Sequence, residues 1–112
     1  MAIEINVEEE FHTEERNVLL RVSGAEPMDV DYSRNGATFQ PAQVTLRWVK
    51  DKNGDWRLGR VRVVGGLIKK SGSVSEATMR ERTWYTVQQL EHSGPDWVQE
   101  IVAEYAPKEE EK

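Results

Sequence analysis

Apolar and polar residues alternate twice near the N-terminus. Ile3, Ile5 and Val7 are separated by Glu4 and Asn6, which is the period of a half-buried strand. Residues 17–23 give a second strand candidate, ended by glycine and proline at positions 24 and 27. The acidic residues 8–15 between the two predict a solvated turn or a short helix. From 24 to 41, proline and an Asn-Gly pair predict a long loop with a short strand near 38–40, and long loops often carry function.

Residues 44–64 predict a β-hairpin. Val44, Leu46 and Trp48 share one face, the polar residues 50–55 form the turn, and Trp56 begins the return strand. On that strand Trp56 and Leu58 occupy even positions, whereas Val61 and Val63 occupy odd positions. One extra residue reverses the alternation, so we predict a bulge near Gly59.

Two structures are compatible with the sequence around residues 65 and 66. Gly65-Gly66 is compatible with a tight hairpin turn or with a second bulge in one long strand. Residues 71–75 predict a flexible loop, and strand character resumes over 79–87.

The C-terminal part predicts one helix. Ser93-Gly94-Pro95-Asp96 is a helix start, with proline and aspartate where the first turn favours them. Trp97, Ile101 and Tyr105 then share one face, and Pro107 ends the helix after Ala106. The predicted fold is therefore α+β and mainly β, a curled antiparallel sheet of about five or six strands with one C-terminal α-helix. We predict that residues 1–107 form a single domain and that residues 108–112 are a disordered charged tail.

Composition narrows the class of protein. The chain has 112 residues, of which 38% are apolar and 31% charged, with four tryptophans as expected core anchors. Cysteine is absent, which excludes a disulfide framework and cysteine-ligated zinc and agrees with a reducing compartment. The sequence shows no secretory signal and no apolar run long enough to span a membrane. We expect a soluble cytoplasmic protein.

Charge is distributed unevenly along the chain. Residues 1–46 carry three basic and nine acidic side chains, residues 47–82 ten and four, and residues 83–112 two and seven, so the segments sum to −6, +6 and −5. The basic middle carries eight candidate residues for a partner or nucleic-acid surface: Arg47, Lys50, Lys52, Arg57, Arg60, Arg62, Lys69 and Lys70. Alternatively, opposed charges pair across strands and neutralise one another.

No motif for catalysis, metal or cofactor binding emerges. His12 and His92 lack neighbouring ligands, and Asp51–Asp55 departs from a calcium loop in the position of its glycine and in its closing residue. Residues 65–71 lack the glycine that a phosphate-binding loop places before its lysine. We expect no enzyme activity.

Several pieces resemble a known group. Trp56-Arg57-Leu58, Val61–Gly65, Lys70-Ser71-Gly72, Trp84 and Pro95–Val98 occur in an order similar to that in small uncharacterised proteins of actinobacteria and their phages. The resemblance covers residues 43–107. It implies a phage or mobile-element setting and assigns no activity.

Three hypotheses follow for function. The first is a non-enzymatic protein-interaction module, an accessory protein of a phage or mobile element, acting through the loop 24–41 or the basic hairpin. The second is a nucleic-acid-binding protein that uses the hairpin 47–70. The third is an acidic mimic of nucleic acid that inhibits a DNA-binding partner. An exposed edge strand would also allow a homodimer.

Overall fold

The computed structural model describes residues 3–12, 15–30 and 36–107, with only the backbone described for 8–12. Within these ranges the chain forms six strands and two helices. The strands are β1 (Glu4–His12), β2 (Glu15–Ser23), β3 (Met28–Asp29), β4 (Thr38–Lys50), β5 (Trp56–Ile68) and β6 (Val74–Trp84). The helices are α1 (Val87–Ser93) and α2 (Asp96–Tyr105).

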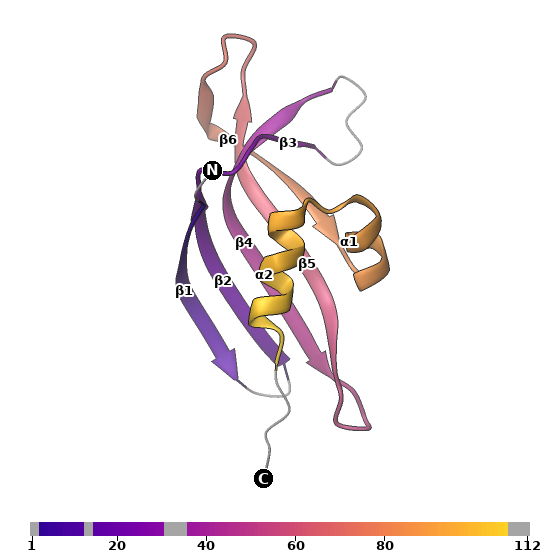
Figure 1. The fold of residues 1–112 in the computed structure, drawn as a ribbon. Coiled ribbons are helices and arrows are strands. Elements are labelled where there is room, and N and C mark those ends of the chain that lie inside the picture. Colours follow the sequence, from indigo (N-terminus) through magenta and orange to yellow (C-terminus); the bar gives the residue numbers. More distant parts are fainter. Residues whose placement is uncertain (1–2, 13–14, 31–35, 108–112) are drawn as a thin grey trace.

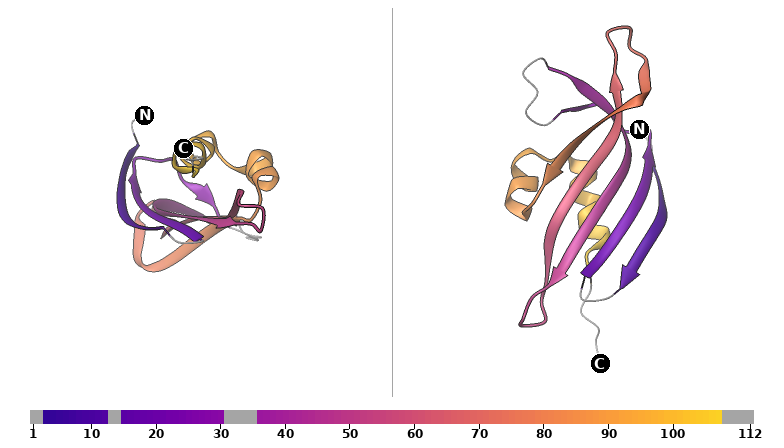
Figure 2. Two further views of the ribbon diagram at one scale, coloured as in Figure 1. Left: turned by 90° about the horizontal axis from the view of Figure 1, so that it is seen from below. Right: turned by 180° about the vertical axis from the view of Figure 1, so that it is seen from behind.

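The strands form one antiparallel sheet in the order β1-β2-β4-β5-β6, and β3 pairs with the start of β4. The sheet curls around α2, which lies in its hollow, while α1 lies beside α2 next to β6 (Figures 1 and 2). The predicted mainly-β fold with a curled antiparallel sheet and a C-terminal helix is confirmed. The second helix, α1, was not predicted.

The core lies between the inner face of the sheet and α2. Alternate residues of β2, β4 and β5 are buried, among them Leu20, Leu46 and Val61, as the period of two requires. From α2, Val98 and Ile101 are buried against them, whereas Trp97 and Tyr105 are only half-buried. The predicted helix is therefore correct in its bounds, but two aliphatic side chains anchor it more deeply than its two aromatic ones.

The bulge predicted near Gly59 is confirmed. Arg47 pairs with Arg60 and the next residue, Trp48, pairs with Leu58, so Gly59 is the extra residue on β5. Arg57, Arg60 and Arg62 therefore all face outward although their spacing is uneven.

Gly65 and Gly66 lie within one long strand, β5, so the pair is not a hairpin turn. The extra residue opposite Gly65 is Ala42 on β4 rather than a residue of β5. A Cβ on Gly65 would lie 1.7 Å from the carbonyl oxygen of Gln40, and one on Gly66 would lie 2.3 Å from that of Ser75. The pairing of β5 with both neighbours is irregular here. Glycine permits this close approach of three strands, and bulges bend a sheet.

Two sequence predictions for the N-terminal third are wrong. Residues 8–12 continue β1 and Glu15 begins β2, so this acidic stretch is paired strand rather than a turn or helix, with residues 13–14 outside the described part. The loop predicted over 24–41 is interrupted by β3, which pairs with residues 38 and 39, and Ala25 and Met28 are buried. The short strand expected near 38–40 is present as the start of β4. The Gln40 side chain also donates to the carbonyl of Ala25 at 2.6 Å. Residues 31–35 of that loop are not described.

Helix α1 replaces the predicted end of a strand after Trp84. Thr86 caps it, since its hydroxyl accepts from the backbone N–H of Gln89 at 3.1 Å. The Gln89 side chain in turn accepts from the N–H of Tyr85 at 2.9 Å, and Leu90 is buried. These capping bonds, the burial of Leu90 and a hydrogen bond from Trp84 to Ser93 hold the seven-residue helix against the sheet.

Candidate functional site

The eight basic residues predicted as a surface do not form one patch. Arg47, Arg57, Arg60 and Arg62 share the outer face of β4 and β5, opposite in parity to the buried residues of these strands. Lys50 and Lys52 lie at the β4–β5 hairpin, and Lys69 and Lys70 lie in the turn after the far end of β5. At about 3.3 Å per residue, the two lysine pairs are separated by roughly 40 Å of strand.

Acidic neighbours balance most of the outward-facing arginines. Arg47 on β4 pairs with Glu15 on β2, and Arg62 on β5 pairs with Glu81 on β6. Arg57 pairs with Asp51 in the hairpin at 3.0 Å. Among the described residues, the Nε atoms of Arg47, Arg60 and Arg62 are buried without a hydrogen-bond partner. Of these three carboxylates only Glu15 comes from the acidic N-terminal segment, whereas Asp51 and Glu81 belong to the basic segment 47–82 itself.

These pairs lower the pKa of two carboxyl groups. The hydrogen bond and charge of Arg47 hold the pKa of Glu15 below its ordinary value. The pKa of Asp51 is lowered chiefly by the backbone N–H of Asp55, with further contributions from the N–H of Asn53 and from Arg57. Asp51 therefore organises the hairpin turn, as expected for a turn rather than a calcium loop.

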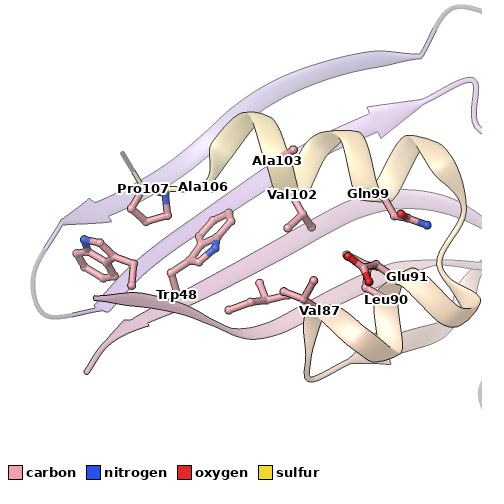
Figure 3. A pocket seen from close by; sticks show the side chains of 11 residues that line it. Trp48, Val87, Leu90, Glu91, Gln99, Val102, Ala103, Ala106 and Pro107 are labelled. Carbon is pink, nitrogen blue, oxygen red and sulfur yellow. The ribbon is translucent and has the colours of Figure 1, made fainter. Parts of the chain in front are cut away.

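A cavity of about 440 Å³ lies between the hairpin end of the sheet and the two helices (Figure 3). We call this space the cavity. Its sheet side is formed by Trp48, Trp56 and Leu58, and its helix side includes Val102, Ala103 and Ala106. Small side chains on α2 therefore lie opposite two indole rings, which leaves a space that the chain's own side chains do not fill.

Polar groups stand at one part of the cavity wall. Glu91 contributes an exposed side chain from α1, and Gln99 contributes an amide from α2. Gln99 donates to the carbonyl of Gly94 at 2.8 Å, which fixes this side chain against the linker between the helices. Lys50 lies with its Nζ 5.7 Å from the centre of the Trp56 ring. The cavity is mainly apolar, and its two polar lining side chains, Glu91 and Gln99, lie at one end of it (Figure 3).

A smaller hollow of about 240 Å³ lies on the other side of α2. Ile3, Ile5, Trp97 and Ile101 form its apolar wall, and Glu100 and Glu104 form its rim. Helix α2 is therefore a ridge between two hollows.

The helical layer is acidic. Residues 85–107 contain four acidic side chains, Glu91, Asp96, Glu100 and Glu104, and no lysine or arginine. The last three are exposed and follow one another at intervals of four along α2, so they form a line on one side of the helix. We call these three residues the acidic stripe. The outer face of the sheet carries arginines, three of them paired with carboxylates, whereas residues 85–107, which include both described helices, carry acidic side chains and no lysine or arginine.

Sequence reasoning missed the cavity because it treated Trp48 and Trp56 as core residues. Trp48 is indeed buried, but Trp56 is half-buried and faces the cavity. The available signal was the pair Ala103 and Ala106 on the predicted helix, where larger residues would fill the space opposite tryptophan.

Within the described ranges, no group of three histidine, cysteine, aspartate or glutamate side chains is arranged to hold a metal ion. Neither helix described here is long and apolar enough to cross a membrane. No protein-family model, curated protein or solved structure matches the chain, so its function must be inferred from the cavity and its surroundings.

Proposed function

We propose that this protein is a non-enzymatic interaction module that binds a partner protein at the cavity between the sheet and the helices. The observation that supports this most directly is the apolar space lined by Trp48 and Trp56. Its volume of about 440 Å³ lies within the range in which pockets bind ligands, roughly 300–1,000 Å³. Tryptophan is also the residue most enriched where protein interfaces gain their binding energy.

A partner side chain in the cavity would gain contacts that the free protein lacks. Ala103 is exposed at the cavity's edge on α2, so a partner segment can approach along the helix without displacing a core residue. The wall opposite is formed by sheet residues on rigid strands, which need no ordering on binding. Such an arrangement favours insertion of one or two apolar anchors.

The outer face offers less support for nucleic-acid binding. Arg47, Arg57 and Arg62 are each paired with a carboxylate, so phosphates would have to displace these partners. Of the remaining candidates, Arg60 lies alone beside these pairs on the outer face, and the four lysines lie at opposite ends of the sheet. A strand of nucleic acid needs a continuous cationic track. We therefore place partner binding at the cavity rather than at the basic hairpin or the loop 24–41.

We also propose that the protein acts in the setting of a phage or mobile element. The resemblance of residues 43–107 to small proteins of actinobacteria and their phages supports an accessory role in a phage or mobile element, with the partner in the cytoplasm.

Site-specific photo-crosslinking in extract of the source organism tests the proposed site. A benzophenone amino acid replaces Val87, an exposed residue of the cavity wall, in one variant and, as a matched control, Thr45 on the outer face in another. We expect a discrete adduct from position 87, suppressed by excess unlabelled protein, and none from position 45. Equal adducts from both positions, or an adduct from position 45 alone, would contradict the proposal.

A further inference from the structure

The acidic stripe has an electrostatic cost that nothing on its own helix offsets. Asp96, Glu100 and Glu104 are spaced at i, i+4 and i+8, and like charges at i, i+4 destabilise a helix. Glu104 also lies in the last turn, which contains no basic residue, where the helix dipole disfavours negative charge. Only Asp96, in the first turn, is favourably placed.

The stripe lies beside the apolar walls described above. Glu100 and Glu104 form the rim of the smaller hollow, and Ala103, between them in sequence, lines the cavity. Glu91 adds a carboxylate to the cavity wall from α1. A molecule seated in the cavity and lying along α2 would therefore meet apolar surface on one side and carboxylates on the other.

We infer that the partner segment is basic and amphipathic, with apolar side chains entering the cavity and lysine or arginine side chains facing Glu91 and the acidic stripe. This inference rests on the proposed function and names the chemistry of the partner. Complementary charge sets both the rate and the selectivity of such an encounter. An amphipathic segment laid along a groove is a recurrent mode of peptide recognition.

A second copy of this chain is a poorer occupant of the same site. Two helical layers placed face to face would bring together two acidic stripes, and juxtaposed like charges disfavour association. A purely apolar small molecule would fill the cavity but leave the carboxylates without partners.

Three fluorescein-labelled peptides of equal length, about that of α2, test the inference by fluorescence anisotropy with the whole protein. The first combines leucine and lysine in an amphipathic helical pattern, the second has glutamate in place of every lysine, and the third has serine in place of every leucine. The leucine–lysine peptide should bind at least about tenfold more tightly than either of the others. Its affinity should also fall between low and physiological salt.

Protein variants test the contributions of the acidic stripe and of the cavity to binding separately. The double variant Glu100→Gln, Glu104→Gln should weaken binding of the leucine–lysine peptide about fivefold, because two exposed ion pairs with the peptide are lost. The matched control, Glu26→Gln with Glu76→Gln, changes the net charge equally at exposed positions outside the helices and should leave binding unchanged. Ala103→Trp should abolish binding because the indole fills the cavity mouth.

Each other outcome overturns a different claim. Equal binding of the leucine–lysine and leucine–glutamate peptides, both lost in Ala103→Trp, would keep the cavity as a docking site and overturn the inference about charge. Leucine–lysine binding that survives Ala103→Trp would overturn the proposed site itself. Equal binding of the two lysine-containing peptides would show charge attraction without an apolar anchor and would overturn the inference, as would no binding of any peptide.

Discussion

Glu100 and Glu104 lie one turn apart on the exposed side of α2, and residues 85–107 contain no lysine or arginine to balance them. The carboxylates of Glu100 and Glu104 therefore repel each other in the free protein, and substitution of either residue would remove this repulsion. This feature links the stability of the helix to the chemistry of the proposed partner.

Glu104→Lys should stabilise the free protein by about 0.5–1 kcal/mol. The substitution replaces a like-charge pair with a Glu–Lys pair in the favourable order and puts a cation at the C-terminal end of the helix. Urea denaturation followed by tryptophan fluorescence measures the change, with Glu104→Gln as an intermediate control. The same variant should bind the leucine–lysine peptide more weakly. A variant that is less stable than the wild type would show that Glu104 has a structural partner.

Ser93→Ala should cost about 1–2 kcal/mol of unfolding free energy. The buried indole of Trp84 donates to the Ser93 hydroxyl at 2.8 Å, and a buried donor left without a partner incurs its desolvation penalty. This bond ties the end of α1 to β6. The matched control Ser71→Ala removes a hydroxyl from an exposed turn and should change stability by less than about 0.5 kcal/mol. Equal effects of the two substitutions would contradict this role.

Gly65→Ala should destabilise the fold by about 3 kcal/mol or more, because its Cβ would lie 1.7 Å from a backbone oxygen of β4. Gly36→Ala is the control, since no atom lies within 4 Å of its Cβ and only its positive φ of 66° opposes the change. That control should cost about 1–2 kcal/mol. Thermal unfolding of both variants distinguishes crowding from backbone strain. A Gly65 variant as stable as the Gly36 variant would mean that β4 can move away.

The Glu15–Arg47 pair should give the fold a specific acid sensitivity. The folded-state pKa of Glu15 is lowered from its ordinary value of 4.5, so the pair's stabilisation is fully present above that value. It is lost as the pH falls through the lower folded pKa, because the unfolded chain then binds the proton more readily.

Carboxyl ¹³C NMR of Arg47→Gln checks this effect. The titration midpoint of Glu15 should rise toward its ordinary value, and unfolding should become less pH-dependent between about pH 5 and 3. Arg57→Gln is the control and should leave Glu15 unchanged. It should move Asp51 only slightly, since the backbone N–H of Asp55 is the largest cause of that lowered pKa. A Glu15 midpoint that is the same in Arg47→Gln and wild type would refute the pairing.

The features that could be predicted from sequence are those fixed by neighbouring residues. The phase change between Leu58 and Val61 located the bulge, and Pro95 with Pro107 located α2 within a residue or two. Helix α1 was missed because its apolar pattern is short and its stability comes from the Thr86 cap and the burial of Leu90. The strand pairing of residues 8–12 depends on β2, which no local pattern of glutamates reveals.

The candidate site depended still more on distant contacts. The arginines of the hairpin were recognisable as basic, but their partners Glu15 and Glu81 come from strands 32 and 19 residues away. The cavity arises where Trp56 meets Ala103 and Ala106, a juxtaposition that follows from how α2 packs in the curled sheet. The residues of the site were identified from the sequence, but the fold that brings them together was not.

The most direct test of partner binding at the cavity is a ¹H–¹⁵N correlation spectrum of the tryptophan indole groups during titration with the leucine–lysine peptide. Trp48 and Trp56 line the cavity, whereas the indole N–H of Trp84 is bonded to Ser93 away from it and serves as an internal reference. We predict saturable shifts of the Trp48 and Trp56 signals with Trp84 unchanged. Shifts confined to the backbone signals of Arg47, Arg60 and Arg62 on the outer face, or no shift of either cavity tryptophan, would contradict the account.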